Sequence, residues 1–225
     1  HYALLNDGRL LFGSELKSLL VVDGLPRNID PRSVEDYFAL GYVPEPRTIF
    51  RDVFKLPPGH TLTVRRGDTR LQPRQYWDVD FAENGISDER EAGMQLIERL
   101  QEAVRIRLIS DVPLGAFLSG GVDSSAVVAL MAGLSADPVN TCSISFGDPD
   151  YNESHYAQMA AERYQTSHQV EEVNPDDFDL IGKLVDLYDE PYADSSAMPT
   201  YRVCELARKR VTVALSGDGG DENLA

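Results

Sequence analysis

The chain has 225 residues, of which 42% are hydrophobic, and its 37 acidic residues against 21 basic ones give a formal net charge of −16. This composition is typical of a folded protein with one large domain or two modest ones. The negative charge argues against nucleic-acid binding, because phosphate backbones are bound by basic surfaces. Two cysteines are too few for a disulfide framework, and no apolar run is long enough for a membrane span, so we expect a cytoplasmic protein.

The first eighty residues predict a β-rich segment with short helices. The turn sequence NDG at residues 6–8 lies between two apolar runs and predicts a hairpin, followed by a short helix over residues 14–20. A second helix is expected from Pro31, with Asp30 as its N-cap residue. A further hairpin is expected over the GD pair at residues 67–68. Three aromatic residues near the second helix are expected in the core: Tyr37, Phe38 and Tyr42.

From about residue 87 the sequence changes to an alternation of helices and strands. Ser87 is the expected N-cap residue of a long helix whose apolar residues recur at helical spacing up to Leu108. Such alternation predicts a parallel sheet with helices on its faces. We therefore divide the chain into a first domain of residues 1–82 and a second of residues 83–225. Strands are expected at 114–118, 141–146, 168–173 and 211–215, and helices at 123–131, 152–164, 174–188 and 197–210.

The segment SGGVDSS, residues 119–125, lies between an expected strand and an expected helix. Glycines let the backbone approach a ligand, and the first-turn N–H groups of a helix have no internal partner, so this loop can cradle an anion. Asp123 would repel a phosphate unless a divalent cation lay between them, which favours a magnesium-bridged phosphate site. The loop is neither a Walker loop nor a Rossmann loop. An ordinary strand–helix turn capped by Asp123 is the alternative.

A second glycine-rich loop, SGDGGDE at residues 216–222, follows the last expected strand. Ligands gather at the carboxyl ends of parallel strands, so the two loops are expected to face one ligand from both sides. Asp123 and Asp221 would then share a magnesium ion and leave Asp218 free to face the reacting group. The alternative is a solvated acidic turn with glycines at positive φ.

These segments together resemble a known family. SGGVDSS is similar to the pyrophosphate loop of ATP pyrophosphatases, and with LSGDGGDE, DEPYADSSAMPTY and YNESHYA it resembles the synthetase domain of glutamine-dependent asparagine synthetases. LLFGSELKSLL and KLPPGHTLTV resemble the end of that family's glutaminase domain, which has an N-terminal-nucleophile fold. The resemblance implies an α/β parallel-sheet ATP-pyrophosphatase domain, preceded by the C-terminal part of an α+β glutaminase domain.

The resemblance also implies a reaction and its cofactors, ATP and Mg²⁺. The β-carboxylate of aspartate would be adenylated with release of pyrophosphate, and ammonia from glutamine would then give asparagine and AMP. No nucleic acid or membrane partner is expected, and the full-length enzyme would be compatible with a homodimer. Asp218 would be catalytic, and Asp123 and Asp221 would hold metal. The nucleotide would contact Phe117, Leu118, Ser119, Gly120, Gly121, Val122, Asp123, Ser124, Ser125, Ile144, Ser216 and Gly217.

The sequence departs from the family pattern at both ends. The family's glutaminase nucleophile is an N-terminal cysteine, whereas this chain begins at His1, and the family continues past the residues at which this chain stops. We therefore expect an interior fragment of a longer enzyme. Neither cysteine can replace the nucleophile, because Cys142 lies in an expected strand and Cys204 in an expected helix, and both are expected to be buried.

Two other functions stay open from the sequence. One is an asparagine-synthetase-like amidotransferase that acts on another carboxylate, as in exopolysaccharide- and exosortase-associated systems. The other is a fragment that binds nucleotide without catalysis.

The remaining candidate residues give weaker evidence for a site. His60, His155 and His168 lack metal-ligand spacing and are expected on the surface or in caps. Residues 189–190 and 194–196 are expected either in a solvated turn or, by the family resemblance, lining the site.

Overall fold

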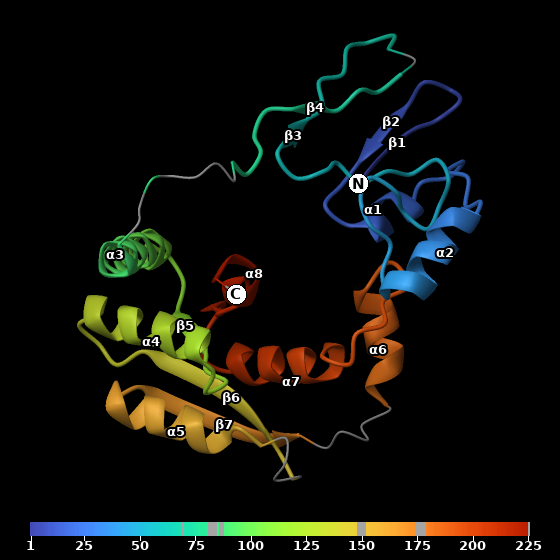
Figure 1. Cartoon of the computed structure of the whole chain (residues 1–225). Helices are drawn as coiled ribbons and strands as arrows, with labels where there is room; N and C mark the ends of the chain where they lie inside the picture. Colours follow the sequence, from blue (N-terminus) through green and yellow to red (C-terminus); the bar gives the residue numbers. More distant parts are fainter. Residues whose placement is uncertain (69, 81–84, 86–87, 148–151, 174–178, 225) are drawn as a thin grey trace. The chain divides into compact units, whose positions relative to one another are not determined.

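The computed structural model in Figure 1 describes the chain apart from residues 69, 81–84, 86–87, 148–151, 174–178 and 225. The chain forms two compact units. One comprises His1–Ala82 with Phe178–Ser195, and the other comprises Glu83–Asp177 with Ser196–Ala225. Residues 178–195, which we assigned to the second domain from the sequence, thus belong to the first unit. The division into two domains at residue 82 stays a prediction.

The first unit begins with the expected hairpin. Strand β1 (Tyr2–Leu4) pairs antiparallel with β2 (Leu10–Phe12), and Gly8 in the turn has a φ of +83°, a conformation that glycine adopts without strain. Helix α1 (Leu16–Leu20) follows, as predicted. The apolar residues of these elements form one core with two later residues of the unit: Ala3, Leu5, Leu16, Leu19, Leu25 and Val53.

Helix α2 (Pro31–Leu40) has the predicted start. The side chain of Asp30 accepts a hydrogen bond from the Arg32 N–H at 3.1 Å, and Gly41 ends the helix in the left-handed conformation. The core placement predicted for the aromatic residues is wrong for two of them, because Phe38 and Tyr42 are exposed and Tyr37 is half-buried. The next hairpin is shorter than expected. It pairs only β3 (His60–Thr61) with β4 (Arg74–Gln75) in the part of the chain that is described.

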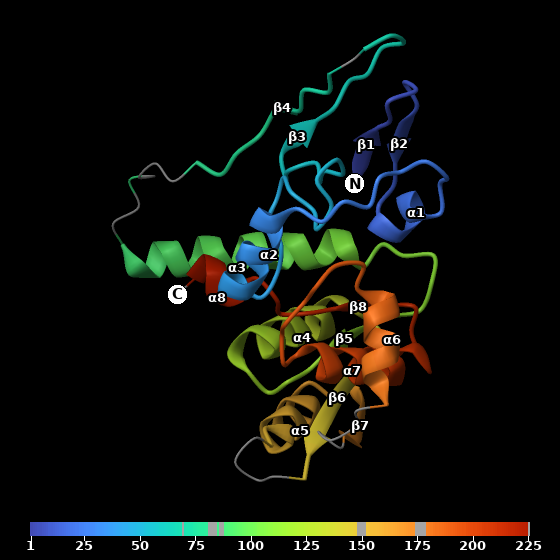
Figure 2. The ribbon, with the colours of Figure 1, turned by 90° about the vertical axis from the view of Figure 1, so that its right-hand side faces the viewer.

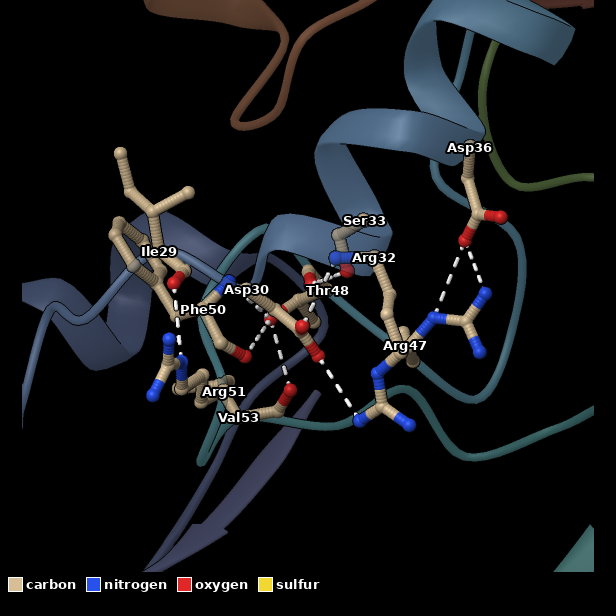
Figure 3. A network of polar contacts seen from close by, with 10 residues as sticks. All are labelled: Ile29, Asp30, Arg32, Ser33, Asp36, Arg47, Thr48, Phe50, Arg51 and Val53. Carbon is tan, nitrogen blue, oxygen red and sulfur yellow. Dashed lines mark hydrogen bonds and ion pairs between the residues drawn. The ribbon is translucent and has the colours of Figure 1, made fainter.

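Thr48 is the centre of a polar network that fixes the loop after α2 (Figure 3). It is fully buried, and its hydroxyl lies within hydrogen-bond distance of the carbonyl groups of Val53 and Phe50, at 2.8 and 3.0 Å. The buried Ser33 hydroxyl donates to the Thr48 carbonyl at 2.7 Å and so ties α2 to this loop. The loop is therefore held by hydrogen bonds to backbone carbonyls as well as by apolar burial.

The later part of the first unit contains helix α6 (Leu180–Leu187) and the residues up to 195. The predicted start of this helix at residues 174–175 lies outside the described residues. The Asp189 carboxylate accepts one hydrogen bond from the Lys17 N–H at 3.0 Å, and the Ala193 N–H donates to the Gly41 carbonyl at 2.8 Å. The solvated-turn alternative is wrong for residues 189–190, because both side chains are largely buried in ion pairs with the first unit. A role in lining the site stays a prediction.

The second unit is built on the predicted parallel sheet, seen from two directions in Figures 1 and 2. Ser87 lies outside the described residues, and Asp88 is the N-cap residue of the first helix, where its carboxylate accepts from the Arg90 N–H at 3.0 Å. The elements are α3 (Glu89–Arg107), β5 (Leu114–Phe117), α4 (Val122–Leu134), β6 (Asn140–Phe146), α5 (Ser154–Arg163), β7 (Ser167–Val173), α7 (Ala197–Arg208), β8 (Val213–Leu215) and α8 (Gly220–Leu224).

The strand order in this sheet is β7-β6-β5-β8, and the pairs are parallel. Ala116 and Leu118 face the side covered by α4 and α5, where they share a core with Val128 and Ala157. The opposite face packs on α7, and its core residues are Cys142, Leu206, Ala207 and Val211 with Phe117 and Val203. Helix α3 packs against α4 and lies above it in both views (Figures 1 and 2). The α/β fold with a parallel sheet is confirmed.

Candidate functional site

The two glycine-rich loops leave neighbouring strands of the sheet. The chain runs from β5 to β6 and β7 on one side, and β8 pairs with β5 on the other, so the strand order reverses between β5 and β8. In open parallel sheets, the crevice outside the carboxyl ends of the strands at such a reversal is where ligands bind. Residues 119–121 follow β5, and residues 216–219 follow β8. The topology therefore brings both loops to one crevice.

The first loop is closed by its own serine hydroxyls. The Oγ atoms of Ser119 and Ser124 lie 2.9 Å apart, and the Ser124 hydroxyl donates to the Gly121 carbonyl at 3.2 Å. The Ser119 hydroxyl accepts from the Gly121 N–H at 3.3 Å. These hydroxyls therefore shape the loop in addition to lining the crevice. Gly121 is the N-cap residue of α4 and has no side-chain cap, so the first-turn N–H groups have no side-chain acceptor at this position.

Glycines bring the second loop against the first at van der Waals distance. A Cβ atom at Gly217 would lie 2.6 Å from the Ser124 nitrogen and 2.8 Å from the Asp123 carbonyl carbon, which are both backbone atoms. A Cβ at Gly220 would collide with the Asp123 carboxyl group. Only glycine permits these approaches. Asp123 on the first loop and the start of α8 after the second loop are thus direct neighbours.

The crevice is a pocket of about 1090 Å³ within the second unit. Five carboxyl groups line it, and no lysine, arginine or histidine does so among the described residues. A phosphate group entering this pocket needs a cation to offset the carboxylates, because like charges repel strongly at short range. The five acidic residues are Asp123, Glu153, Asp218, Asp221 and Glu222.

The pocket contains most of the residues expected to bind nucleotide or metal, and two of them do not line it. Gly120 has a φ of +92°, and a Cβ there would lie 2.7 Å from the Ala157 nitrogen, so this glycine allows α5 to approach the loop. Ser125 lies on α4 away from the lining, half-buried. The predicted residues that do line the pocket are Phe117, Leu118, Ser119, Gly121, Val122, Asp123, Ser124, Ile144, Ser216, Gly217, Asp218 and Asp221.

Some lining residues were not predicted as site residues from the sequence. Glu153 is the N-cap residue of α5, and Thr200 and Val203 lie on α7, which forms a wall of the pocket.

Cys142 also lines the pocket and is buried as predicted. Burial raises the pKa of its thiol, and the nearby Arg210 opposes that rise. Cys204 is exposed on α7, so the prediction that it is buried is wrong. Hydrophobic periodicity predicts the helices and strands on which these residues lie, but it does not predict which of those elements form the pocket wall.

The carboxyl groups around the pocket are oxygen ligands of the kind that magnesium accepts. Among the described residues there is no group of three histidine, cysteine or acidic side chains that could enclose a metal ion. Magnesium is usually bound by one or two carboxylates together with phosphate oxygens and water, so a site with few protein ligands fits it. Asp123 is the best-placed carboxylate, because it lies on the phosphate-type loop and against Gly220 next to Asp221.

Comparisons with known proteins agree with this architecture. The asparagine synthase family model matches residues 95–225, and a glutamine amidotransferase domain model matches residues 1–77. A Methanocaldococcus jannaschii protein named "Putative asparagine synthetase (glutamine-hydrolyzing) 2" is 40% identical over 98% of this chain and 43% of its own length. Bacillus subtilis asparagine synthetase (glutamine-hydrolyzing) 1 is 32% identical over 99% of this chain and 34% of its own length.

A solved structure, the NH3-dependent NAD synthetase from Campylobacter jejuni in complex with nitrate, has a TM-score of 0.41 and 13% identity over 58% of each chain. At this TM-score the likeness supports no conclusion by itself.

The parallel sheet and the two loops lie in the part of the chain that the asparagine synthase family model matches, and a glutamine amidotransferase domain model matches the part before them. The chain belongs to the asparagine synthase family. It spans less than half the length of the curated relatives named above. None of the helices in the described part of the chain is long and apolar enough to span a membrane.

Proposed function

We propose that this chain carries the nucleotide site of an ATP-dependent amide ligase that converts aspartate to asparagine. Ammonia from glutamine would be the nitrogen donor, and AMP, pyrophosphate and glutamate would be the other products. The observation that carries the proposal is the contact of Gly217 with the backbone of Asp123 and Ser124. This contact joins two glycine-rich loops into one pocket at the point where the strand order reverses.

In the proposed first step, a β-carboxylate oxygen of aspartate attacks the α-phosphorus of ATP. The bond from that phosphorus to the bridging oxygen breaks, and pyrophosphate leaves with the electron pair. The role of residues 119–125 would be to hold the departing pyrophosphate with backbone N–H groups, where negative charge develops. Ammonia would then attack the acyl carbon, AMP would leave with the electron pair of the acyl–oxygen bond, and the added nitrogen would lose a proton. Asp218, which lines the pocket, is the acidic residue that we propose for this centre.

A magnesium ion, when bound, would neutralise charge on the phosphates. Asp123 and Asp221 are the carboxylates that we propose to hold it, because Asp123 abuts Gly220 and Asp221 is the next residue. Phe117 and Ile144 would contact the nucleotide through apolar groups and backbone. The lack of a cationic side chain among the described lining residues supports a metal requirement, since ATP brings several negative charges to a pocket that already has five carboxyl groups.

Asp123→Asn is expected to lower the rate of magnesium-dependent pyrophosphate release by at least about 100-fold, because metal-assisted charge stabilisation supplies several kcal/mol. The substitution keeps the size of the side chain and removes its charge. Pyrophosphate release from Mg·ATP by the intact protein measures the effect. Asp137→Asn, at an exposed aspartate outside the pocket, is the matched control and should keep the wild-type rate. An unchanged rate in Asp123→Asn would remove Asp123 from the metal site.

Aspartate is expected to stimulate pyrophosphate release from ATP by the intact protein, and glutamine or ammonia is expected to convert the product to asparagine. A panel of other carboxylates, tested at the same concentrations, provides the comparison. Turnover with another carboxylate and none with aspartate would assign the chain to an amidotransferase with a different acceptor. Binding of Mg·ATP without turnover of any acceptor would instead support a nucleotide-binding role.

A further inference from the structure

His168 lies in a polar cluster beneath the first loop, where we had expected a surface or capping residue. It stands on β7, opposite Thr141 of β6 in the parallel register. Its Nδ1 atom is 2.9 Å from the Thr141 Oγ1 atom, and its Nε2 atom is 3.4 Å from the Ser143 Oγ atom. The imidazole ring is thus hydrogen-bonded at both nitrogens to neighbouring residues of one strand.

The hydrogen bonds of this cluster extend to Leu118, the residue before the first glycine-rich loop. The Ser143 hydroxyl donates to the Leu118 carbonyl, and the Leu118 N–H donates to the Cys142 carbonyl at 3.0 Å. Ser143 and Leu118 are almost fully buried. Both polar backbone groups of Leu118 are therefore held by β6, and the next residue, Ser119, begins the loop. Ser143 is also one of the residues that line the pocket.

The hydrogen bond from Ser143 to Leu118 decides which atoms donate in the rest of the cluster. Because the Ser143 hydroxyl gives its hydrogen to a carbonyl, it can only accept from His168, so Nε2 must carry the proton. A neutral ring then accepts at Nδ1 from the Thr141 hydroxyl, which itself accepts from the Thr166 hydroxyl at 2.8 Å. Burial lowers the pKa of His168, which favours the neutral ring, and a hydrogen bond with the backbone of Thr141 opposes that shift.

We propose that His168 is a positioning residue for the nucleotide loop: its Nε2–H fixes the Ser143 hydroxyl, which holds the Leu118 carbonyl and sets the start of residues 119–121. The ligand of this loop, Mg·ATP, rests on the proposed function above. His168 does not line the pocket, so it acts through Ser143 and not on the substrate. A buried chain of this kind is rigid because each member has a partner whose loss leaves a buried polar group unsatisfied.

Three substitutions separate the hydrogen bond from the packing. His168→Gln keeps an N–H donor near the position of Nε2, His168→Asn keeps a polar group only near Nδ1, and His168→Leu keeps volume alone. In the intact protein we expect the Kd of Mg·ATP to rise about tenfold in the Asn and Leu variants and to stay within about threefold in the Gln variant. Rescue by Gln and not by Asn is a result that a purely structural role would not produce.

A second readout does not depend on nucleotide. Amide hydrogen exchange of residues 118–122, measured without ligand, is expected to be about tenfold faster in the Leu and Asn variants, and ¹⁵N NMR of wild-type His168 is expected to place the proton on Nε2. Ser143→Ala should raise the exchange rate of the same residues, which keeps the test available if His168→Leu does not fold. Thr166→Val removes only a donor to Thr141 and leaves the hydrogen bonds of His168 with Thr141 and Ser143 in place, so it is the control and should leave the loop unchanged.

The two proposals fail in different ways. If the wild-type protein does not bind Mg·ATP, the proposed function fails, while hydrogen exchange and NMR still decide the role of His168. If the wild-type protein binds Mg·ATP and the Leu and Asn variants match it in both Kd and exchange, the positioning role is overturned. A proton on Nδ1 in the NMR spectrum would overturn it as well, because Ser143 would then have no donor.

Discussion

Gly217→Ala is expected to abolish binding of Mg·ATP, with a loss of affinity of at least about 100-fold, or about 2.7 kcal/mol. The added Cβ would meet the Ser124 nitrogen at 2.6 Å and the Asp123 carbonyl carbon at 2.8 Å. Because both are backbone atoms of the α4 start, no rotamer change relieves the overlap, and the two loops must move apart. Gly220→Ala is expected to cost less, because the atoms it meets belong to the mobile carboxyl group of Asp123.

The control for this substitution lies in the helix that follows the first loop. A Cβ at Gly133, near the end of α4, meets no atom within 4 Å, and alanine favours the helix by up to about 1 kcal/mol. Gly133→Ala should therefore bind Mg·ATP as the wild type does and unfold at a slightly higher temperature. Isothermal titration with Mg·ATP measures both variants. Wild-type affinity in Gly217→Ala would show that the two loops do not share one ligand.

The sequence was sufficient to predict both loops but not their contact. Strand–helix alternation predicts a parallel sheet, and it leaves the order of the strands open, because each strand reads as the same kind of apolar run. The reversal of order between β5 and β8 comes from tertiary pairing. The glycines of the second loop were attributed to turns and ligand approach, whereas Gly217 and Gly220 also allow one loop to pack on the other.

The predicted environments of Phe38 and His168 were wrong for the same physical reason. Phe38 recurs at helical spacing with its neighbours, but spacing does not identify the face that packs, and its side chain is 82% exposed. His168 was expected to be a surface or capping residue because no metal-ligand spacing surrounds it, yet its partners are on the neighbouring strand and not near it in sequence. Contacts between residues far apart in the chain leave no local pattern to read.

Residues 189–190 are the clearest case of such a contact. Glu190 lies far along the chain from the N-terminal part of the first unit, and yet its carboxylate binds two groups there. Its Oε2 atom is 2.6 Å from the Lys55 Nζ atom, and its Oε1 atom accepts from the Ile49 N–H at 2.6 Å. Lys55 also donates to the Val43 carbonyl at 2.6 Å. The side chains of Lys55 and Glu190 are only 17% and 13% exposed.

Glu190→Ala is expected to destabilise the first unit by about 3 kcal/mol, because removal of one partner of a largely buried ion pair leaves the other charge uncompensated. The Ile49 N–H would also lose its acceptor. Since the chain has two units, a single unfolding midpoint does not isolate this effect. Hydrogen exchange of residues 47–55 in the intact protein does, and these amides are expected to exchange roughly 100-fold faster than in the wild type.

An exposed ion pair on α3 provides the matched control for this experiment. Arg105 and Glu102 form hydrogen bonds of 2.6 and 2.7 Å, but both side chains are more than half exposed, so solvent screens the pair. Glu102→Ala should leave the stability close to that of the wild type. The double variant of Glu190→Ala with Lys55→Met should recover part of the loss, because the methionine leaves no unpaired charge. A loss in Glu190→Ala no larger than in Glu102→Ala would mean that the segment after α6 is not held to the first unit by this pair.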